Sequence, residues 1–337
     1  MVAPQVEIDR PGPLLPLAVA SRCAYPELVS QLQAESGIDV EYRTDGILCV
    51  ALDDAGSRAL SVRTRWQRRA GLRVTDLTPA AARRLCPIVS PRITLAVHFP
   101  DDHRVNNERL AVAAGLAASR AGVTIRERVL VHAIEARGGR VCGVRTAEGP
   151  IVAPVVVNAA GAWSASVGAP PGVVVPPVFP VRGQMLVLRA PADALPLPIY
   201  GRGAYLVPRT DGRILLGSTL ERVGFEKRVT VGAATGLLAA AMAMAPGLGD
   251  ATLEGAYAGL RPGTPDELPV LGEAPDLPGL YYATGLYRSG ILLAPAVATA
   301  ITELIVDGRT ALTVAAFRPG RRMRARGVTL AARRGRR

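Results

Sequence analysis

Residues 280–295 read LYYATGLYRSGILLAP and join two elements of different kinds. The first five residues are apolar or aromatic apart from one threonine, which predicts a strand. From Gly290 the apolar pattern continues to position 306 and stops at Asp307-Gly308, which predicts a helix. The first N–H groups of a helix lack intrahelical partners and form the positive end of its dipole. The turn between the two elements therefore favours an anionic group.

Two arginines lie beside glycines where predicted strands pass into loops. Arg261 belongs to AGLRPGTPDELPVLG (258–272), and Arg288 lies in the turn just described. A guanidinium group is the side chain best shaped to hold a carboxylate through two parallel hydrogen bonds. Both arginines are therefore candidates for carboxylate binding. The alternative for Arg261 is an ion pair within the fold, with Asp266 or Glu267.

Two more segments place small residues next to a predicted strand. In VVVNAAGAWS (155–164), small residues after the strand would let a ligand approach the backbone, although such turns also pack a helix against a sheet. In GRGAYLVPRTDGRILLGST (201–219), Tyr205 starts a strand, where its hydroxyl could face a cavity. Taken alone, Tyr205 is more simply interpreted as a core residue.

The rest of the pattern predicts a mixed α/β fold with many short strands. Thr78 is predicted to cap a helix that begins at Pro79, and Gly37 and Gly122 to follow helix ends. The run IVAPVVV (151–157) is predicted as one continuous buried strand. Further helices are expected at 15–37, 107–121 and 232–245, and further strands at 47–52, 123–126, 128–135, 140–146 and 253–261.

The net charge of +12 is concentrated at one end of the chain. Residues 318–337 contain nine arginines and no acidic residue, which leaves +3 for residues 1–317. This arrangement is typical of a solvated, disordered tail and is a weak signal for nucleic acid. Aromatic residues make up 4% of the chain, too few for a base-stacking surface. We therefore expect no specific nucleic-acid partner.

Cysteine and hydropathy patterns indicate a reducing compartment. The four cysteines are widely spaced without a CxxC pair, and the three histidines lack metal-ligand spacing, so neither a disulfide framework nor a metal site is predicted. The opening residues MVAPQVEIDRPGP carry prolines and charges where a signal peptide has an apolar core. No segment is typical of a membrane span. We expect a cytoplasmic protein.

Five segments in the same order resemble the D-amino-acid oxidase superfamily of FAD-dependent enzymes, and most closely the bacterial glycine oxidases of thiamine biosynthesis. They are NAAGAWS (158–164), PVRGQ (180–184), YLVPRTDGRILLGST (205–219), GLRPGTPDELPVLG (259–272) and GLYRSGILLAP (285–295). The resemblance implies a Rossmann-like FAD-binding domain and a substrate domain built on a mixed antiparallel sheet. The implied FAD-binding domain comprises 1–40, 105–175 and 265–317, and the substrate domain 41–104 and 176–264, followed by the tail 318–337.

The resemblance also implies roles for individual residues. Tyr205 and Arg261 would anchor the substrate carboxylate, and Arg288 would line the same pocket beside the flavin. Leu220 stands where glycine oxidases can have a methionine facing the pocket, a departure that changes the shape of the pocket. The residues implied to contact FAD are Val131 at the adenosine end, Gly161 by the pyrophosphate, and Gly285, Tyr287, Arg288, Ser289, Gly290, Ile291 and Leu292 along the flavin ring.

One departure from the family pattern concerns the first residues. The family opens with a strand–GxGxxG–helix unit, and no such motif occurs in these 337 residues. Met1-Val2-Ala3-Pro4 instead resembles the segment that follows that unit. We therefore expect the chain to lack the first βαβ unit of the FAD-binding domain.

The implied reaction is oxidative deamination of glycine or another small amino acid. The substrate would yield an imine and then a 2-oxo acid, FAD would accept the hydride, and dioxygen would become hydrogen peroxide. The implied partner is thiazole synthase, which would receive the imine, and a homo-oligomer is expected. Three alternatives stay open: a D-amino-acid dehydrogenase that reduces a quinone, a sarcosine-oxidase-like enzyme, and an inactive truncated remnant.

Overall fold

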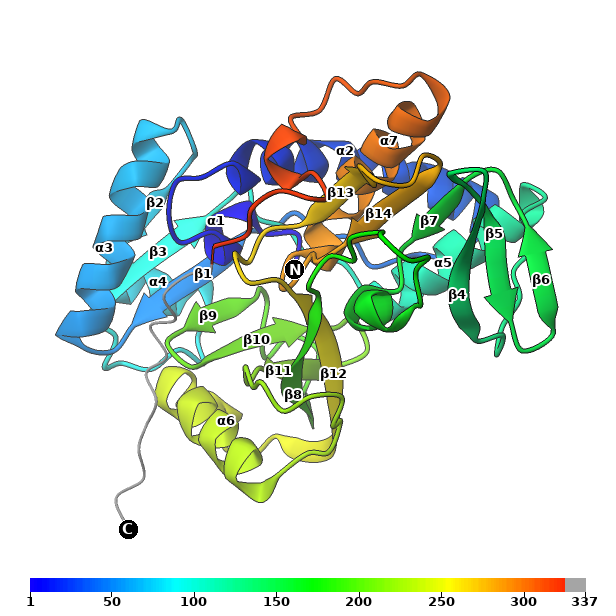
Figure 1. The fold of residues 1–337 in the computed structure, drawn as a ribbon. Coiled ribbons are helices and arrows are strands. Elements are labelled where there is room, and N and C mark those ends of the chain that lie inside the picture. The colour runs from blue at the N-terminus through cyan, green and yellow to red at the C-terminus, as the bar shows by residue number, and fades with distance from the viewer. Residues whose placement is uncertain (325–337) are drawn as a thin grey trace, which may run out of the picture.

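A computed structural model describes residues 1–324 (Figure 1). Three sheets and the helices around them make a mixed α/β fold, which confirms the predicted fold class. The first residues of the chain lie at the centre of the molecule, where Val2 is fully buried (Figure 1). No helix in the described part of the chain is long and apolar enough to cross a membrane.

The largest sheet has eight strands in the order β12-β8-β11-β10-β9-β1-β3-β2. Neighbouring strands are antiparallel except for the parallel pair β1 and β9. All of these strands fall within the two ranges expected for the substrate domain. Their bounds are β1 Ile47–Ala51, β2 Thr75–Leu77, β3 Leu95–Phe99, β8 Phe179–Arg189, β9 Ile199–Gly201, β10 Ala204–Pro208, β11 Arg213–Gly217 and β12 Thr252–Gly263.

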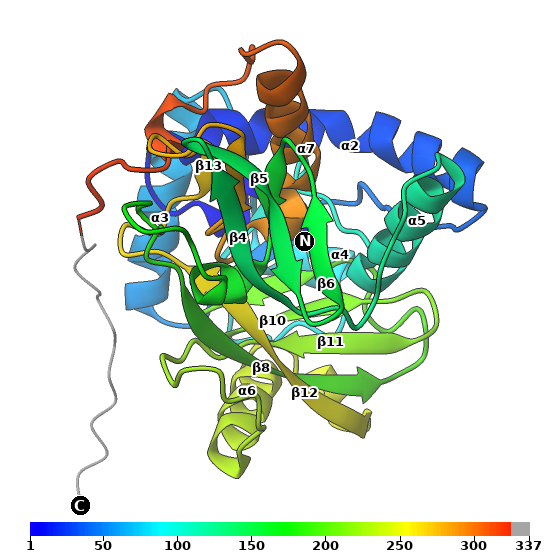
Figure 2. The same cartoon turned by 45° about the vertical axis from the view of Figure 1, so that its right-hand side comes forward.

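Three helices accompany this sheet: α3 (Asp54–Arg69), α4 (Pro79–Leu85) and α6 (Val231–Met244). Figure 2 shows α6 next to the sheet, where it packs against β8, β10 and β11. Leu237 and Ala241 of α6 join Leu186, Leu206 and Leu216 in one buried cluster. This apolar layer covers the face of the sheet that carries Leu186, Leu206 and Leu216.

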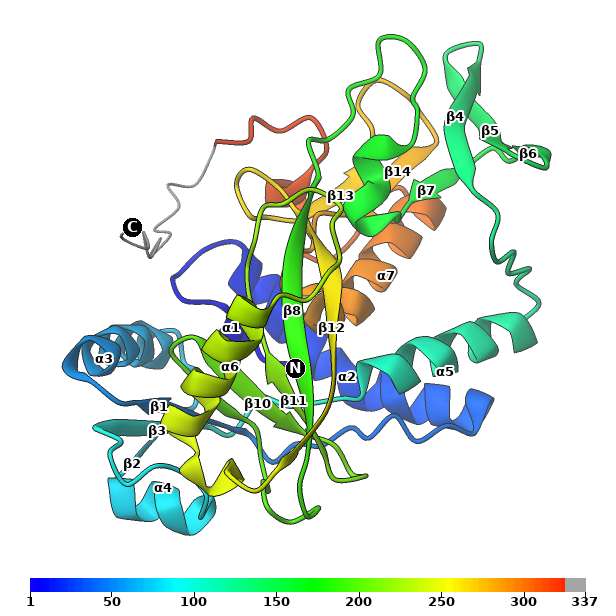
Figure 3. The ribbon, with the colours of Figure 1, turned by 90° about the horizontal axis from the view of Figure 1, so that it is seen from below.

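A second, smaller sheet has the order β13-β14-β7, with bounds β13 Val270–Glu273, β14 Leu280–Thr284 and β7 Val156–Asn158. The helices α2 (Leu14–Ser36), α5 (Asn107–Arg120) and α7 (Gly290–Val306) lie side by side in Figure 3. They share a buried cluster that includes Leu17, Leu110 and Leu293. The helix predicted to follow residues 285–289 is thus confirmed, and α2 fixes its position.

Local sequence signals predicted several element boundaries correctly. Gly37 ends α2 with φ 76°, a left-handed conformation that glycine adopts readily. The Thr78 hydroxyl accepts a hydrogen bond from the Ala81 N–H, and Pro79 is the first residue of α4. Both signals depend only on neighbouring residues, which explains why they could be read from the sequence.

The third sheet corrects two strand predictions. It consists of β4 (Val131–Arg137), β5 (Arg140–Thr146) and β6 (Gly149–Val152). The run 151–157 is not one strand, because it divides between β6 and β7, which belong to different sheets. Pro154 lies at the break, and its missing N–H cannot join a ladder. Residues 123–126 form no strand either, and Val123 is 54% exposed.

The predicted tail begins too early at Arg318. Phe317 is fully buried, and Arg321 donates hydrogen bonds from Nε and Nη2 to the Asp266 carboxylate at 2.9 and 3.0 Å. Arg321 Nη2 also donates to the Leu268 carbonyl at 3.0 Å. The start of the basic segment is therefore attached to the folded chain. Residues 325–337, which the tail prediction also covers, lie outside the described residues.

A buried carboxylate is among the groups that attach the four-residue helix α1 (Pro4–Glu7) to the rest of the chain. Asp102 accepts hydrogen bonds from the backbone N–H groups of Gln5 at 3.1 Å and Val6 at 2.9 Å, and it is fully buried. Burial raises the pKa of this carboxyl to about 7, against the opposing effect of the two N–H donors. Asp102, together with Gln67, which donates a hydrogen bond to the Gln5 carbonyl at 2.7 Å, holds α1 and with it Glu7 in place.

We expect Asp102→Ala to lower the free energy of unfolding by about 2–4 kcal/mol, because two buried N–H groups lose their acceptor. The folded pKa of Asp102 lies above its unfolded value, so its contribution falls as pH rises from about 4 to about 7. The loss in the variant should therefore be larger at pH 5 than at pH 8. Urea unfolding at both pH values measures it.

Asp101→Ala is the matched control, since Asp101 pairs with the largely exposed Arg73 and should contribute less than about 1 kcal/mol. Equal losses in the two variants would contradict the role given to Asp102.

Candidate active site

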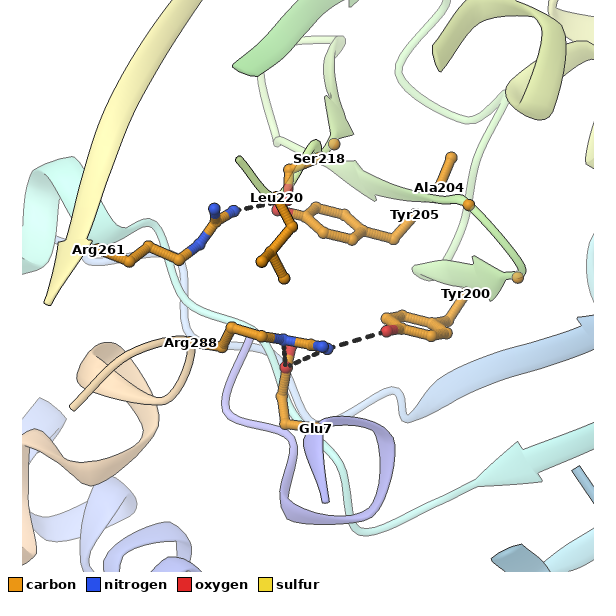
Figure 4. Close-up of a pocket in the computed structure, with 11 residues that line it drawn as sticks. Glu7, Tyr200, Ala204, Tyr205, Ser218, Leu220, Arg261 and Arg288 are labelled. Carbon is orange, nitrogen blue, oxygen red and sulfur yellow. Dashed lines mark hydrogen bonds and ion pairs between the residues drawn. The ribbon is translucent and has the colours of Figure 1, made fainter. Parts of the chain in front are cut away.

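A small pocket of about 160 Å³ opens between β9–β11 of the large sheet, α1, and the turn before α7 (Figure 4). Its volume has room for several water-sized groups. The charged residues in its wall are Glu7, Arg261 and Arg288. The other lining residues are Tyr200, Gly201, Gly203, Ala204, Tyr205, Gly217, Ser218 and Leu220.

Arg261 reaches the pocket from the end of β12. Its guanidinium donates hydrogen bonds to Ser218 Oγ at 2.6 Å and to the Thr219 carbonyl at 3.2 Å, and both acceptors are neutral. Asp266, one of the two partners considered from sequence, is held by Arg321 instead. Among residues 1–324 Arg261 has no ion pair. Its charge is therefore available to an anion in the pocket.

Tyr205 lines the pocket from β10. Its ring stacks on Tyr200 with centroids 6.2 Å apart and an interplanar angle of 12°. A Cβ atom on Gly217, in the paired strand β11, would lie 2.7 Å from the Tyr205 hydroxyl. The glycine thus leaves room for the ring, and Tyr205 is a pocket residue rather than a core residue.

Arg288 lies in the same pocket but forms an ion pair with Glu7. Its Nη2 is 2.8 Å from Glu7 Oε2, its Nε donates to the same oxygen at 3.0 Å, and Nη2 donates to the Tyr200 hydroxyl at 3.0 Å. Coulombic attraction to Glu7 outweighs burial and raises the pKa of the Arg288 guanidinium. No local motif marks Glu7 or Tyr200, so neither could be identified from the sequence as a residue of the site.

A larger cavity of about 390 Å³ adjoins the pocket and shares Glu7, Tyr205, Arg261 and Arg288 with it. It extends to Met1 and to the N-terminus of α7, where Gly290 and Ile291 line it. The N-cap residue Ser289 makes no side-chain cap hydrogen bond. The first N–H groups of α7 therefore remain suited to the anionic edge of a bound ring system.

The sequence model of the DAO family, described as FAD dependent oxidoreductase, matches residues 1–304. The chain belongs to this family. Glycine oxidase of Pseudomonas putida is 37% identical over 309 residues, which cover 91% of this chain and 83% of that protein. The crystal structure of glycine oxidase from Geobacillus kaustophilus is 33% identical with a TM-score of 0.91, and the match covers 95% of this chain and 86% of that one.

A further relative is the bifunctional protein ThiO/ThiG of Synechocystis, which is 37% identical over 327 residues. The match covers 95% of this chain but 47% of that protein, so the chain spans about half the length of the bifunctional relative. As in other DAO-family members, the cofactor of this chain is FAD. The residues that line the cavity beside α7, and the N-terminus of α7 without a side-chain cap, fit the flavin ring of FAD.

The residues predicted to contact FAD are only partly gathered at this cavity. Tyr287, Arg288, Gly290 and Ile291 line it, while Ser289 lines a neighbouring pocket of about 130 Å³. The Leu292 side chain is buried in the cluster between α2 and α7, so only its backbone could face a ligand.

Three other predicted FAD contacts lie away from the walls of this cavity. Gly285 has φ 70°, and a Cβ there would lie 2.8 Å from Thr264. Gly161 begins the 3-10 helix η1 (Gly161–Ser166), and its carbonyl accepts a hydrogen bond from the Thr284 hydroxyl at 3.1 Å. Val131 begins β4 of the third sheet. The contacts of Gly285 with the flavin ring, of Gly161 with the pyrophosphate and of Val131 with the adenosine end remain predictions.

Proposed function

We propose that this DAO-family member oxidises glycine or another small amino acid to the imine, and then to the 2-oxo acid, with formation of hydrogen peroxide. The observation that carries the proposal is Arg261, a guanidinium without an acidic partner in residues 1–324, in a small pocket beside the cofactor cavity. The identity of 37% to a glycine oxidase supports the same reaction class.

In this proposal the residues of the pocket bind and orient the substrate. Arg261 holds the carboxylate by charge-assisted hydrogen bonds, and Tyr205 lies beside it as a further donor. Leu220 provides an apolar wall, and the small volume of about 160 Å³ favours a substrate with little or no side chain. Bound FAD supplies the hydride acceptor and the route of electrons to dioxygen. Orientation of the substrate Cα by its carboxylate accounts for much of the rate enhancement expected from this chain.

The experiment is a peroxide assay on the FAD-loaded protein with glycine, sarcosine and D-alanine as substrates. We expect glycine to give the highest kcat/KM, and dioxygen to serve as electron acceptor. A preference for sarcosine would favour an N-methyl amine oxidase. Turnover with a quinone analogue but not with dioxygen would favour a dehydrogenase. No oxidation of any of the three by a protein that holds FAD would overturn the proposal.

We further propose that the imine serves the synthesis of the thiamine thiazole, with thiazole synthase as the partner, as the sequence resemblance implies. A cytoplasmic location and a homo-oligomeric state complete the proposal. Co-purification with thiazole synthase and light scattering of the purified protein test the two interactions separately.

A further inference from the structure

The acidic residue of the pocket is bound to only one of its two arginines. The Glu7 carboxylate contacts Arg288 through two nitrogens, at 2.8 and 3.0 Å, and its side chain is 9% exposed. The Arg288 side chain is 34% exposed and is held from the other side by the Tyr200 hydroxyl. Figure 4 shows Glu7, Arg288 and Tyr200 as one connected group, with Arg261 apart from it beyond Leu220.

This arrangement gives the pocket one unbalanced positive charge. Of its three charged lining residues, Glu7 and Arg288 neutralise each other, and Arg261 has only neutral partners among residues 1–324. A single carboxylate bound to Arg261 neutralises this positive charge. A second carboxylate would have to displace Glu7 from Arg288 or lie close to its negative charge, and both are costly where water is partly excluded.

We propose that Glu7 determines substrate charge: by occupying Arg288 it restricts the pocket to monocarboxylates, and its neutralisation makes Arg288 available to a second carboxylate. The proposal rests on the proposed function, since it assumes that this pocket receives the substrate carboxylate. It predicts that Glu7→Gln extends recognition to small dicarboxylates of the size of malonate or iminodiacetate. Asp102, which fixes α1, would support this role of Glu7 from outside the pocket.

The test compares acetate and malonate as unreactive ligands of the FAD-loaded protein, with dissociation constants from calorimetry. Removal of one negative charge should tighten both ligands, so the informative quantity is the ratio of their dissociation constants. A bidentate, charge-assisted contact with Arg288 should shift this ratio toward malonate by about 10- to 100-fold in Glu7→Gln. The double variant Glu7→Gln/Arg288→Gln should return the ratio to the wild-type value.

Asp9→Asn is the charge-matched control, because Asp9 lies two residues from Glu7 and does not line the pocket. It should leave the ratio unchanged. A ratio that stays constant in Glu7→Gln would overturn the inference, and so would a shift that persists in the double variant. If Glu7→Gln does not fold, Glu7→Ala should shift the ratio of dissociation constants toward malonate in the same way. A constant ratio in Glu7→Ala would then overturn the inference.

The outcome is separable from that of the proposed function. Glycine oxidation by the wild type together with a constant ratio would overturn the inference alone. A shifted ratio in a protein that does not oxidise glycine would overturn the proposed function alone, because ligand binding requires no turnover. Iminodiacetate oxidation by Glu7→Gln, at least tenfold faster in kcat/KM than by the wild type, would extend the result from binding to catalysis.

Discussion

Arg261→Ala should raise the KM for glycine by about 10- to 100-fold while the absorption spectrum of bound flavin changes little. Glycine has no side chain, so its carboxylate is the strongest handle for binding. A charge-assisted bidentate contact contributes about 1.5–3 kcal/mol, which corresponds to that range of affinity. Steady-state kinetics on the FAD-loaded variant measure the effect. Arg261→Lys should recover only part of it, because an ammonium group lacks the planar pair of donors.

The matched control for Arg261 is Arg189→Ala. Arg189 lies on the same sheet and pairs with Glu254, outside the pocket. It should leave the KM unchanged. An Arg261→Ala variant with a normal KM and a lower free energy of unfolding would show that Arg261 has only a structural role, and the substrate assignment would fall.

The sequence predicted the parts of the fold and site that depend on short-range signals. The strand 280–284 and the helix 290–306 were predicted with the bounds that the structure has, because hydrophobic periodicity and an Asp-Gly stop mark them locally. Arg261 could be proposed because its chemistry and flanking glycines suggest anion binding. That Arg261 has no acidic partner among residues 1–324 could not be predicted, since one of the two candidates, Asp266, is held by the distant Arg321.

Contacts between distant segments account for what the sequence did not predict. Glu7 and Arg288 are 281 residues apart in the sequence. They meet because α1 lies next to the turn before α7. The strand at 151–157 was predicted from composition, but its two halves pair with different neighbours, β5 and β14. Strand assignment depends on the partner as well as on the residue, and the partner is set by the whole fold.

Gly183→Ala should impair glycine binding about as much as loss of the Arg261 guanidinium, although it leaves Arg261 in place. Gly183 of β8 pairs with Gly259 of β12, and Arg261 is the diagonal neighbour on the same face. A Cβ on Gly183 would lie 2.1 Å from Arg261 Nη1 and 2.5 Å from its Cζ, so the guanidinium has to move away from Ser218. We expect a rise of about 10- to 100-fold in KM for glycine.

The stability of this variant should distinguish displacement of Arg261 from damage to the sheet. Gly183 is not among the glycines with positive φ, so alanine fits its backbone conformation. Alanine also lowers the conformational entropy of the unfolded chain, which raises the free energy of unfolding by about 0.4–1 kcal/mol. Gly255→Ala in the same strand pair meets nothing within 4 Å of its Cβ and lies outside the lining of the cofactor cavity, so it serves as the control, with a normal KM expected. A Gly183→Ala variant that binds glycine like the wild type would show that the position of the Arg261 guanidinium does not determine affinity.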